Sequence, residues 1–194
     1  VENVTVANLT LTGGYSESHG CTGGGALLLT ADDMFDQEGE VEQNNTVLEN
    51  VIIENSRSHN GGGLALFRVD GPVLNNVLIK DNTAAVNGGG IYSFKSTMTI
   101  KESIVSNNSS FTNGGGITAI GGGVGSAGIG ALVIEDCIVT GNLATQNHGG
   151  GIMIFTSNAT LTDVTISGNN CIVDGSFGGG IVMNFSEATM TNVT

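Results

Sequence analysis

The chain has 194 residues, of which 18 are acidic and 5 are basic, so its net charge is −13. Nucleic-acid binding needs clustered Lys and Arg, and the few basic residues are scattered, so DNA, RNA and anionic membranes are disfavoured as partners. No apolar stretch approaches the roughly 20 residues that span a bilayer, and 32 glycines with a single proline are typical of neither collagen nor a helix bundle.

An internal repeat organises the chain. A glycine triplet followed by an aliphatic residue or Ala recurs every 26 to 38 residues. The first glycines of the triplets are Gly23, Gly61, Gly88, Gly114, Gly149 and Gly178. A second phrase, complete in residues 99–108, ends about six residues before the next triplet. Repeats at this period indicate one supersecondary unit that stacks on its neighbours.

Aligned repeats place apolar residues in columns. The first column is Val6, Leu48, Leu74, Ile100, Ile134, Leu161 and Met190. The second is Leu9, Val51, Val77, Ser103, Cys137, Val164 and Val193. The third is Leu11, Ile53, Ile79, Val105, Val139 and Ile166. After the triplets comes a fourth column of Ala26, Leu64, Ile91, Ile117, Ile152 and Ile181. One unit cannot bury its own apolar face, whereas stacked units join the columns into a continuous core.

Each unit contains short strands with period-two alternation, broken at Gly or Asn, and shows no helical periodicity. This pattern predicts an all-β fold, a parallel β-helix of about six to seven coils that forms a single solenoid over residues 1–194. Both ends cut through repeats without an atypical capping unit, so we expect a segment of a longer chain or a unit continued by a neighbour.

Two repeats are longer than the others, with insertions at about residues 31–45 and 121–130. Both insertions lie between a triplet and the next first-column residue. Insertions in solenoids emerge as loops on one face, so we expect both to protrude from the same side.

The first insertion is acidic and carries Asp32, Asp33, Asp36 and Glu38. An EF-hand turning at Gly39 would need other residues at positions 34 and 45. We therefore expect a solvated acidic loop and no cofactor. A looser Ca²⁺ site at these carboxylates is the alternative.

The repeat phrases resemble those of a known class. Residues 24–27 read Gly-Gly-Ala-Leu, and aliphatic-x-x-Asn phrases occupy residues 79–82, 105–108, 139–142 and 166–169. They resemble right-handed parallel β-helix repeat proteins, and within these the polymorphic outer membrane protein type, which pairs GGA-aliphatic with F-x-x-N. The other five triplets have a third Gly in place of Ala. The resemblance implies a right-handed β-helix and an extracellular or cell-surface setting, such as an adhesin or an autotransported passenger.

One column holds the candidate catalytic carboxylates. Glu102, Asp136 and Asp163 follow one another in a column that otherwise contains Asn8, Asn50, Asn76 and Asn192. Adjacent coils would place such carboxylates about 5 Å apart, as a retaining glycosidase requires. We favour a turn role, because Asn, Asp and Glu hold turns by side-chain to backbone hydrogen bonds. The absence of Trp, the presence of only two Tyr and the charge of −13 also disfavour sugar stacking and polyuronate substrates.

An outward column predicts an interface. Four aliphatic residues, Ile52, Leu78, Ile104 and Ile138, occupy consecutive repeats at a position that alternation turns outward. Such a stripe indicates a lateral protein partner, either another copy or a neighbouring domain of the same chain. Coverage by one of the insertions is the alternative.

Eight N-x-S/T sequons predict N-glycosylation in a secretory pathway. They begin at Asn3, Asn8, Asn44, Asn107, Asn108, Asn158, Asn184 and Asn192. The strand pattern alone also favours such triplets.

The cysteines and histidines give weaker signals. Cys137 belongs to a core column and is expected to be a buried thiol. Cys21 and Cys171 precede different triplets about five coils, or roughly 24 Å, apart, which is too far for a disulfide within this segment. The three histidines, His19, His59 and His148, stand at different offsets before triplets, so we expect turn residues and no metal site.

The sequence therefore predicts an extracellular or cell-surface structural or adhesive rod, or a filament subunit, without a catalytic site. Its expected partners are further copies or neighbouring domains, with glycans as a second class. The alternative is a carbohydrate-active enzyme of the β-helix type, a polysaccharide lyase or glycoside hydrolase that uses the carboxylate column.

Overall fold

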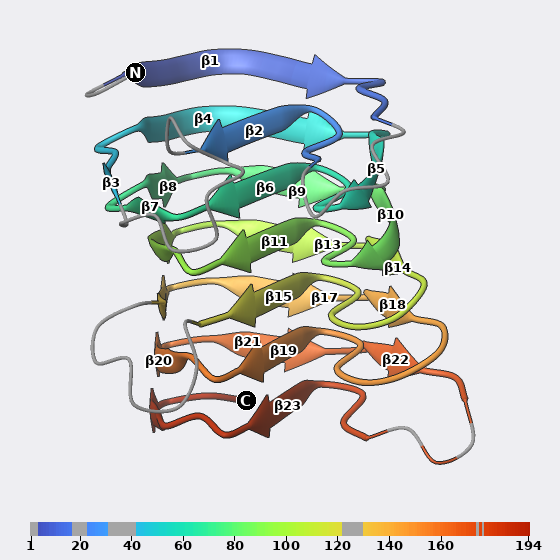
Figure 1. Cartoon of the computed structure of the whole chain (residues 1–194). Coiled ribbons are helices and arrows are strands. Elements are labelled where there is room, and N and C mark those ends of the chain that lie inside the picture. The colour runs from blue at the N-terminus through green and yellow to red at the C-terminus, as the bar shows by residue number, and fades with distance from the viewer. Residues whose placement is uncertain (1–3, 17–22, 31–41, 122–129, 174, 176) are drawn as a thin grey trace.

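A computed structural model describes residues 4–16, 23–30, 42–121, 130–173, 175 and 177–194. The chain winds into coils that stack from β1 at one end to β23 and β24 at the other (Figure 1). All pairings between named strands in the described part are parallel. The predicted all-β parallel β-helix is confirmed.

Three sheets run along the axis of the stack. The long sheet has eleven strands and divides after β4 into two halves. Its first half contains β1 (Thr5–Thr12), β4 (Val47–Glu54), β8 (Val73–Asn75), β12 (Thr97–Lys101), β16 (Ala131–Glu135), β20 (Asn158–Thr162) and β24 (Ala188–Thr191). β1 and β4 continue into the second half, whose other strands are β9 (Leu78–Lys80), β13 (Ile104–Ser106), β17 (Ile138–Thr140) and β21 (Thr165–Ser167).

The other sheets complete each coil. The short sheet contains β5 (Arg57–Asn60), β10 (Thr83–Asn87), β14 (Ser109–Ser110), β18 (Leu143–Ala144) and β22 (Asn170–Cys171). The glycine sheet follows the triplets and contains β2 (Leu27–Thr30), β6 (Leu64–Phe67), β11 (Ile91–Phe94), β15 (Ile117–Ile120), β19 (Ile152–Phe155) and β23 (Ile181–Asn184). A separate pair joins β3 (Glu42–Gln43) to β7 (Val69–Asp70).

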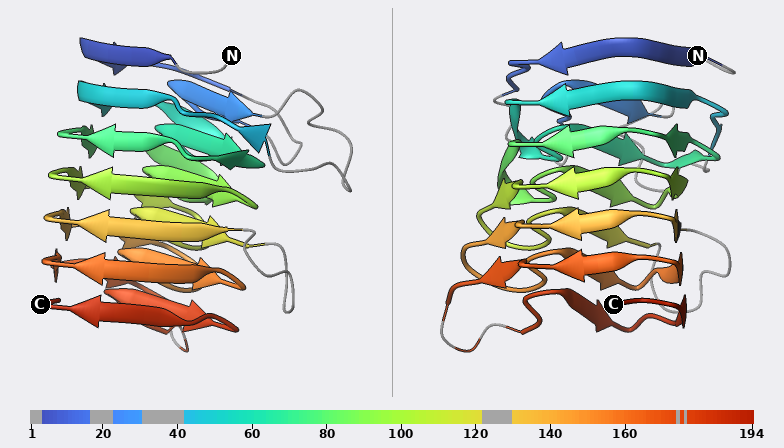
Figure 2. Two further views of the ribbon diagram at one scale, coloured as in Figure 1. Left: turned by 90° about the vertical axis from the view of Figure 1, so that its left-hand side faces the viewer. Right: turned by 180° about the vertical axis from the view of Figure 1, so that it is seen from behind.

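The coil is right-handed, as the resemblance implied. In Figure 1 the strands of the glycine sheet run leftward in front while those of the long sheet run rightward behind, and the chain descends at each turn. The reverse view in Figure 2 shows the long sheet in front. Right-handed crossover between parallel strands is the rule because strands twist in a fixed sense.

The register confirms the predicted columns. In the first column, Leu48 pairs with Leu74, which in turn pairs with Ile100. In the third column, Ile53, Ile79 and Val105 pair in the same way. These side chains form one core that continues from coil to coil. Burial of each Leu or Ile contributes about 1.5–3 kcal/mol.

The fourth column needs one correction. Leu27, not Ala26, pairs with Leu64. Ala26 instead takes the place of a third glycine, because its N–H and that of Leu27 both bond to Gly63 O.

Several columns of residues turn the chain with positive φ, and two of them flank the second half of the long sheet. The exposed corner column, between the halves of the long sheet, has φ between 48° and 57°. Its members are Asn8, Asn50, Asn76, Glu102, Asp136, Asp163 and Asn192. Another column leads into the short sheet and contains Asn55, Asp81, Asn107, Gly141 and Gly168. Asn, Asp and Gly tolerate this left-handed region best.

A ladder of amides lies buried directly after the second of these columns. This buried amide ladder consists of Asn82, Asn108 and Asn142, and it ends at the half-buried Asn169. The Asn108 Nδ2 donates to Asn142 Oδ1 at 3.0 Å and to the Ile79 carbonyl at 2.9 Å. Its Oδ1 accepts from the N–H and Nδ2 of Asn82, both at 3.0 Å. Asn82 and Asn108 are 0% exposed, so these hydrogen bonds satisfy polar groups that water cannot reach.

The third residue of the triplets is glycine because it lies against this ladder and the backbone of the next coil. A Cβ at Gly116 would stand 2.7 Å from Gly151 O and 3.0 Å from the Asn142 Nδ2. In the coil that follows the first unit, Ser56 stands where the later coils have the ladder asparagine, and its N–H donates to Asn82 Oδ1. Ser56 is smaller than Asn, which accounts for the Ala at the third position in the first unit.

The two insertions leave the coil at the same corner. Each departs after a strand of the glycine sheet and returns before the first half of the long sheet, between Thr30 and Glu42 and between Gly121 and Gly130. The direction in which they protrude lies outside the described residues.

Candidate functional site

The predicted interface residues form an axial row on the long sheet. Register pairs Ile52 with Leu78, Leu78 with Ile104, and Ile104 with Ile138. Ile104 and Ile138 are 39% and 41% exposed, and the other two are half-buried. We call these four residues the apolar stripe. Because they lie in register on the same side of β4, β9, β13 and β17, they present a continuous apolar row.

Charges flank the stripe on both sides, with Glu54, Lys80 and Asp81 on one side and the carboxylates Glu102 and Asp136 of the exposed corner column on the other. On the neighbouring outward column, Lys80 Nζ lies 3.0 Å from Glu54 Oε2 and 3.6 Å from Asp81 Oδ2. The hydrogen bond from Lys80 to Glu54 raises the pKa of the lysine, followed by the charge of the same carboxylate. Ser106, Thr140 and Ser167 continue that column without charge. A shallow groove of about 290 Å³ separates the stripe from the exposed corner column.

The three candidate catalytic carboxylates share one backbone position. Glu102, Asp136 and Asp163 are exposed and have φ of 48°, 52° and 56°. The Asp163 Oδ1 accepts a hydrogen bond from Asn192 Nδ2 at 2.9 Å. At the other end of the column Asn76 Nδ2 donates to Asn50 Oδ1 at 2.7 Å. The turn role is thus visible in the backbone, while the catalytic role stays a prediction.

The flank of this column carries an ion pair. Lys101 Nζ lies 2.8 Å from Glu135 Oε2 across adjacent strands. The hydrogen bond to Glu135 raises the pKa of Lys101 most, and the charges of Glu135, Asp136 and Glu102 act in the same direction. The ammonium therefore offsets part of the negative charge along this corner.

The sequons divide by burial. Asn8, Asn107, Asn158, Asn184 and Asn192 are exposed. Asn108 is a correction, because its Nδ2 is fully buried and donates two hydrogen bonds. A glycan on that nitrogen would break the buried amide ladder. Asn44 is also buried, at 8% exposure, and its Oδ1 accepts from the backbone N–H of Thr46. Asn3 lies outside the described residues.

The thiols differ in environment. Cys137 is buried in its predicted column, and desolvation raises the pKa of its thiol to about 11. Cys171 is a half-buried free thiol at the end of β22, and its Sγ donates to Asn147 O at 2.8 Å. Cys21 lies outside the described residues.

The alternative Ca²⁺ site stays a prediction. Asp32, Asp33, Asp36 and Glu38 lie outside the described residues, as does His19. His148 Nδ1 accepts from the Phe177 N–H at 3.1 Å. Among the residues that are described, no group of three or more His, Cys, Asp or Glu side chains is arranged to hold a metal ion.

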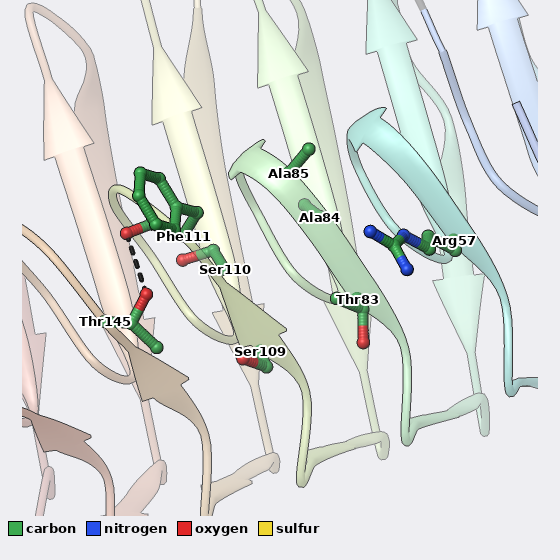
Figure 3. A pocket seen from close by; sticks show the side chains of 8 residues that line it. All are labelled: Arg57, Thr83, Ala84, Ala85, Ser109, Ser110, Phe111 and Thr145. Carbon is green, nitrogen blue, oxygen red and sulfur yellow. Dashed lines mark hydrogen bonds between the residues drawn. The ribbon is translucent and has the colours of Figure 1, made fainter. Parts of the chain in front are cut away.

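A groove on the short sheet was not expected from the sequence. It has a volume of about 270 Å³ and its lining combines a cation, hydroxyl groups and an exposed ring (Figure 3). We call it the short-sheet groove. The lining residues are Arg57, Thr83, Ala84, Ala85, Ser109, Ser110, Phe111 and Thr145.

Exposed phenyl rings correct the view that the chain lacks surfaces for sugar stacking. Phe111, Phe177 and Phe185 are 56%, 67% and 71% exposed. The expectation counted Trp and Tyr and overlooked Phe. The spacing of Phe111, three residues after the ladder residue Asn108, is the signal that would have placed its ring outward on the short sheet.

The sequence matches no protein-family model, no curated protein and no solved structure. Within the described ranges, no helix is long and apolar enough to cross a membrane.

Proposed function

We propose that this chain is part of an extracellular or cell-surface rod with a structural or adhesive role. The observation that carries the proposal is the apolar stripe, a partly exposed row of Ile and Leu along the axis of a protein whose net charge is −13. On one flank of the stripe Lys80 pairs with Glu54, whereas Glu102 lines the groove on the other flank. Copies that meet along the stripe would gain from apolar burial, against the repulsion of the carboxylates beside it.

Stiffness supports the structural role. Adjacent coils share the apolar core, backbone hydrogen bonds and the buried amide ladder. In solenoids the stability is approximately the sum of intrinsic repeat terms and such contacts between neighbouring repeats. Each coil is therefore held in a fixed position on the next. A rod of this kind keeps its surface residues at fixed spacing.

The size of the stripe favours repeated weak contact with further copies. Three residues per strand at about 3.3 Å, and four coils at about 4.8 Å, cover a surface of only about 200 Å². A stable interface needs about 800 Å² from each partner. One stripe therefore gives weak association, and lateral assembly would gain strength from many contacts in series.

Electron microscopy and light scattering of the chain test this proposal. We expect concentration-dependent lateral assembly that Ile104→Lys and Ile138→Lys abolish, because each lysine places a charge in the apolar row. Thr160→Lys is the matched control, since Thr160 is exposed on the first half of the same sheet, outside the stripe. Monomers at all concentrations, or equal loss in the control, would contradict the proposal.

We infer that the repeats are of the polymorphic outer membrane protein type. Two observations support this: Ala26 occupies a third-glycine place, and the Asn of each aliphatic-x-x-Asn phrase belongs to the buried amide ladder. With that type goes the proposal of a cell-surface setting and of N-glycans at the exposed sequons. Mass spectrometry of the native material tests it, with glycan expected at positions such as Asn158 and none at Asn108.

A carbohydrate-active enzyme is the second candidate. The favouring observation is that Glu102, Asp136 and Asp163 leave adjacent coils from the same left-handed corner. Neighbouring coils place such groups at roughly the separation of a retaining glycosidase pair. A cleavage screen with polysaccharides, on the chain and on an Asp136→Asn, Asp163→Asn variant, separates this candidate from the rod.

A further inference from the structure

The short-sheet groove is lined by residues of four successive coils. Register aligns Arg57 with Thr83 and Thr83 with Ser109. At about 4.8 Å per coil, these three residues extend about 10 Å along the axis. The next outward positions on β10 and after β14 are Ala85 and Phe111. The small methyl group of Ala85 beside the phenyl ring leaves the hollow that Figure 3 shows, with Ala84 and Ala85 between Phe111 and Arg57.

The two ends of the groove have different chemistry. At one end the Phe111 ring is 56% exposed, and its carbonyl is fixed by a 3.0 Å hydrogen bond from Thr145 Oγ1. At the other end the guanidinium of Arg57 extends toward Ala84 (Figure 3). Within the described part of the chain, no carboxylate forms an ion pair with Arg57, whereas Lys80 and Lys101 both have one. A guanidinium without such a partner is suited to a bidentate contact with an incoming carboxylate.

The middle of the groove supplies hydroxyl groups. Thr83 is exposed and Ser109 is half-buried, and both face outward. Behind them, Ser110 Oγ is buried and has no hydrogen-bond partner among the described residues. Because Ser110 pairs in register with the buried Ala84 and Ala144, its hydroxyl lies beneath the groove, and the hydroxyl groups offered to a ligand are those of Thr83 and Ser109.

We propose that the short-sheet groove binds one carboxylate-bearing pyranose of a glycan. The apolar face of the sugar stacks on Phe111, its hydroxyls bond to Thr83 and Ser109, and its carboxylate binds Arg57. The net charge of −13 selects against long polyanions, so a single acidic unit within or at the end of a glycan fits better than a polyuronate. This site would supply the adhesive contact of the proposed rod, and it rests on that role.

Titration by NMR, with the methyl glycosides of N-acetylneuraminic acid, glucuronic acid and glucose as probes, tests the assignment. We expect the acidic glycosides to shift the amide signals around Thr83 and Ser109, with a dissociation constant of about 1 mM for so open a groove. The neutral glucoside should bind at least about tenfold more weakly, since it cannot form the charge-assisted hydrogen bonds. A difference between the two acidic probes would tell which acidic sugar fits.

Matched variants locate the contacts. Arg57→Gln and Lys101→Gln change the net charge equally, from −13 to −14. Only the first should weaken acidic-sugar binding, by about tenfold or more. Phe111→Ala should weaken binding, and Phe185→Ala, which removes another exposed ring, should not. All four side chains reach the surface, so unchanged thermal melting is the expected control for folding.

Three results would overturn the assignment: no binding of any probe, equal binding of the glucoside, or equal losses in Arg57→Gln and Lys101→Gln. Light scattering distinguishes these outcomes from failure of the rod itself. If the chain assembles through its apolar stripe but binds no acidic sugar, the rod stands and the groove assignment is wrong. If it binds acidic sugar as a monomer, the groove assignment stands and lateral assembly is wrong.

Discussion

Two columns of turn residues run along the same rod, and they differ in how much the sequence varies. The buried amide ladder contains Asn at four consecutive positions, from Asn82 to Asn169. The exposed corner column has the same left-handed backbone in every coil but accepts Asn, Asp or Glu. Positive φ restricts the residue type only mildly when the side chain faces water. The buried position admits only a group that both donates and accepts along the stack.

At the exposed corner only the local backbone conformation limits the residue type, whereas in the ladder the neighbouring coils limit it as well. At the exposed corner, Asn76 bonds to Asn50 at 2.7 Å, yet the next member is Glu102, which replaces the amide with a carboxylate. In the ladder, each amide satisfies the carbonyl of a strand, as Asn142 Nδ2 does for Val105 O at 2.9 Å. Loss of one buried amide therefore leaves partners unsatisfied in more than one coil.

The largest expected effect is that of Asn108→Asp. The carboxylate would face the Ile79 carbonyl and the Asn142 Oδ1, both of which now accept from Asn108 Nδ2. A buried charge without a partner destabilises by about 3–5 kcal/mol. Urea unfolding measures the change, and Asn107→Asp, at the exposed neighbour, is the matched control. Similar unfolding free energies for the two variants would contradict the distinction between the columns.

Gly116→Ala should have the next largest effect, because it probes the space beside the ladder. Its Cβ would meet Gly151 O at 2.7 Å and the Asn142 amide at 3.0 Å. Such overpacking destabilises by about 1–3 kcal/mol. Gly180→Ala is the matched control, since Gly180 is also the third glycine of a triplet, has no positive φ, and would place its Cβ 3.5 Å from the nearest atom, Ile166 Cγ2. If the two variants unfold alike, steric contact with the ladder and the next coil does not explain the third glycine.

The same comparison explains what sequence analysis predicted. Columns such as Leu48, Leu74 and Ile100 were predictable because period-two alternation and a repeated phrase fix the register. The predicted fourth column was wrong by one residue in the first unit, because the Ala at a glycine position was taken for the first residue of the strand.

Sequence interpretation fails where one pattern fits two structural roles. Residues 108–110 form a glycosylation sequon, yet Asn108 also fits the buried ladder, and only the packing of adjacent coils distinguishes the two roles. The short-sheet groove depends on Ala85 standing beside Phe111 from another coil, a relation that no local sequence window contains. The acidic insertion has no repeat partner to set its position.

Cys137 lies where the exposed corner column meets the core, because it directly follows the exposed Asp136 and faces inward. Burial raises the pKa of its thiol from the usual 9.0 to about 11. The folded state therefore holds this proton more tightly, so the contribution to stability is complete below pH 9.0 and is lost as pH rises toward 11.

Cys137→Ser removes this dependence. Ser103 already occupies the same column in the preceding coil and accepts a hydrogen bond from the Val77 N–H at 2.9 Å, so serine fits the position. We expect a change within about 1 kcal/mol at pH 7. Unfolding free energies measured from pH 8 to 11 should fall more steeply for the parent chain than for the serine variant. Parallel curves would mean that the thiol is not desolvated.

The smallest effect is expected for the double variant Asp136→Asn, Asp163→Asn. Both residues sit at the left-handed corner, where Asn already occurs in three of the first coils, at Asn8, Asn50 and Asn76. The substitution removes two negative charges, from −13 to −11, at exposed positions. Surface changes of this kind stay within about 0.5 kcal/mol, and urea unfolding should show no larger shift.

The same variant decides between the rod and the enzyme, because it changes the carboxylates without disturbing the turn. If the column serves only to turn the chain, lateral assembly and any glycan binding persist, and a polysaccharide cleavage screen gives the same result for variant and parent. Turnover by the parent that disappears in the variant, at unchanged stability, would assign catalysis to the corner. In that case the carboxylates would be present in the exposed corner column because they catalyse cleavage. Tolerance of the left-handed backbone alone would not explain them.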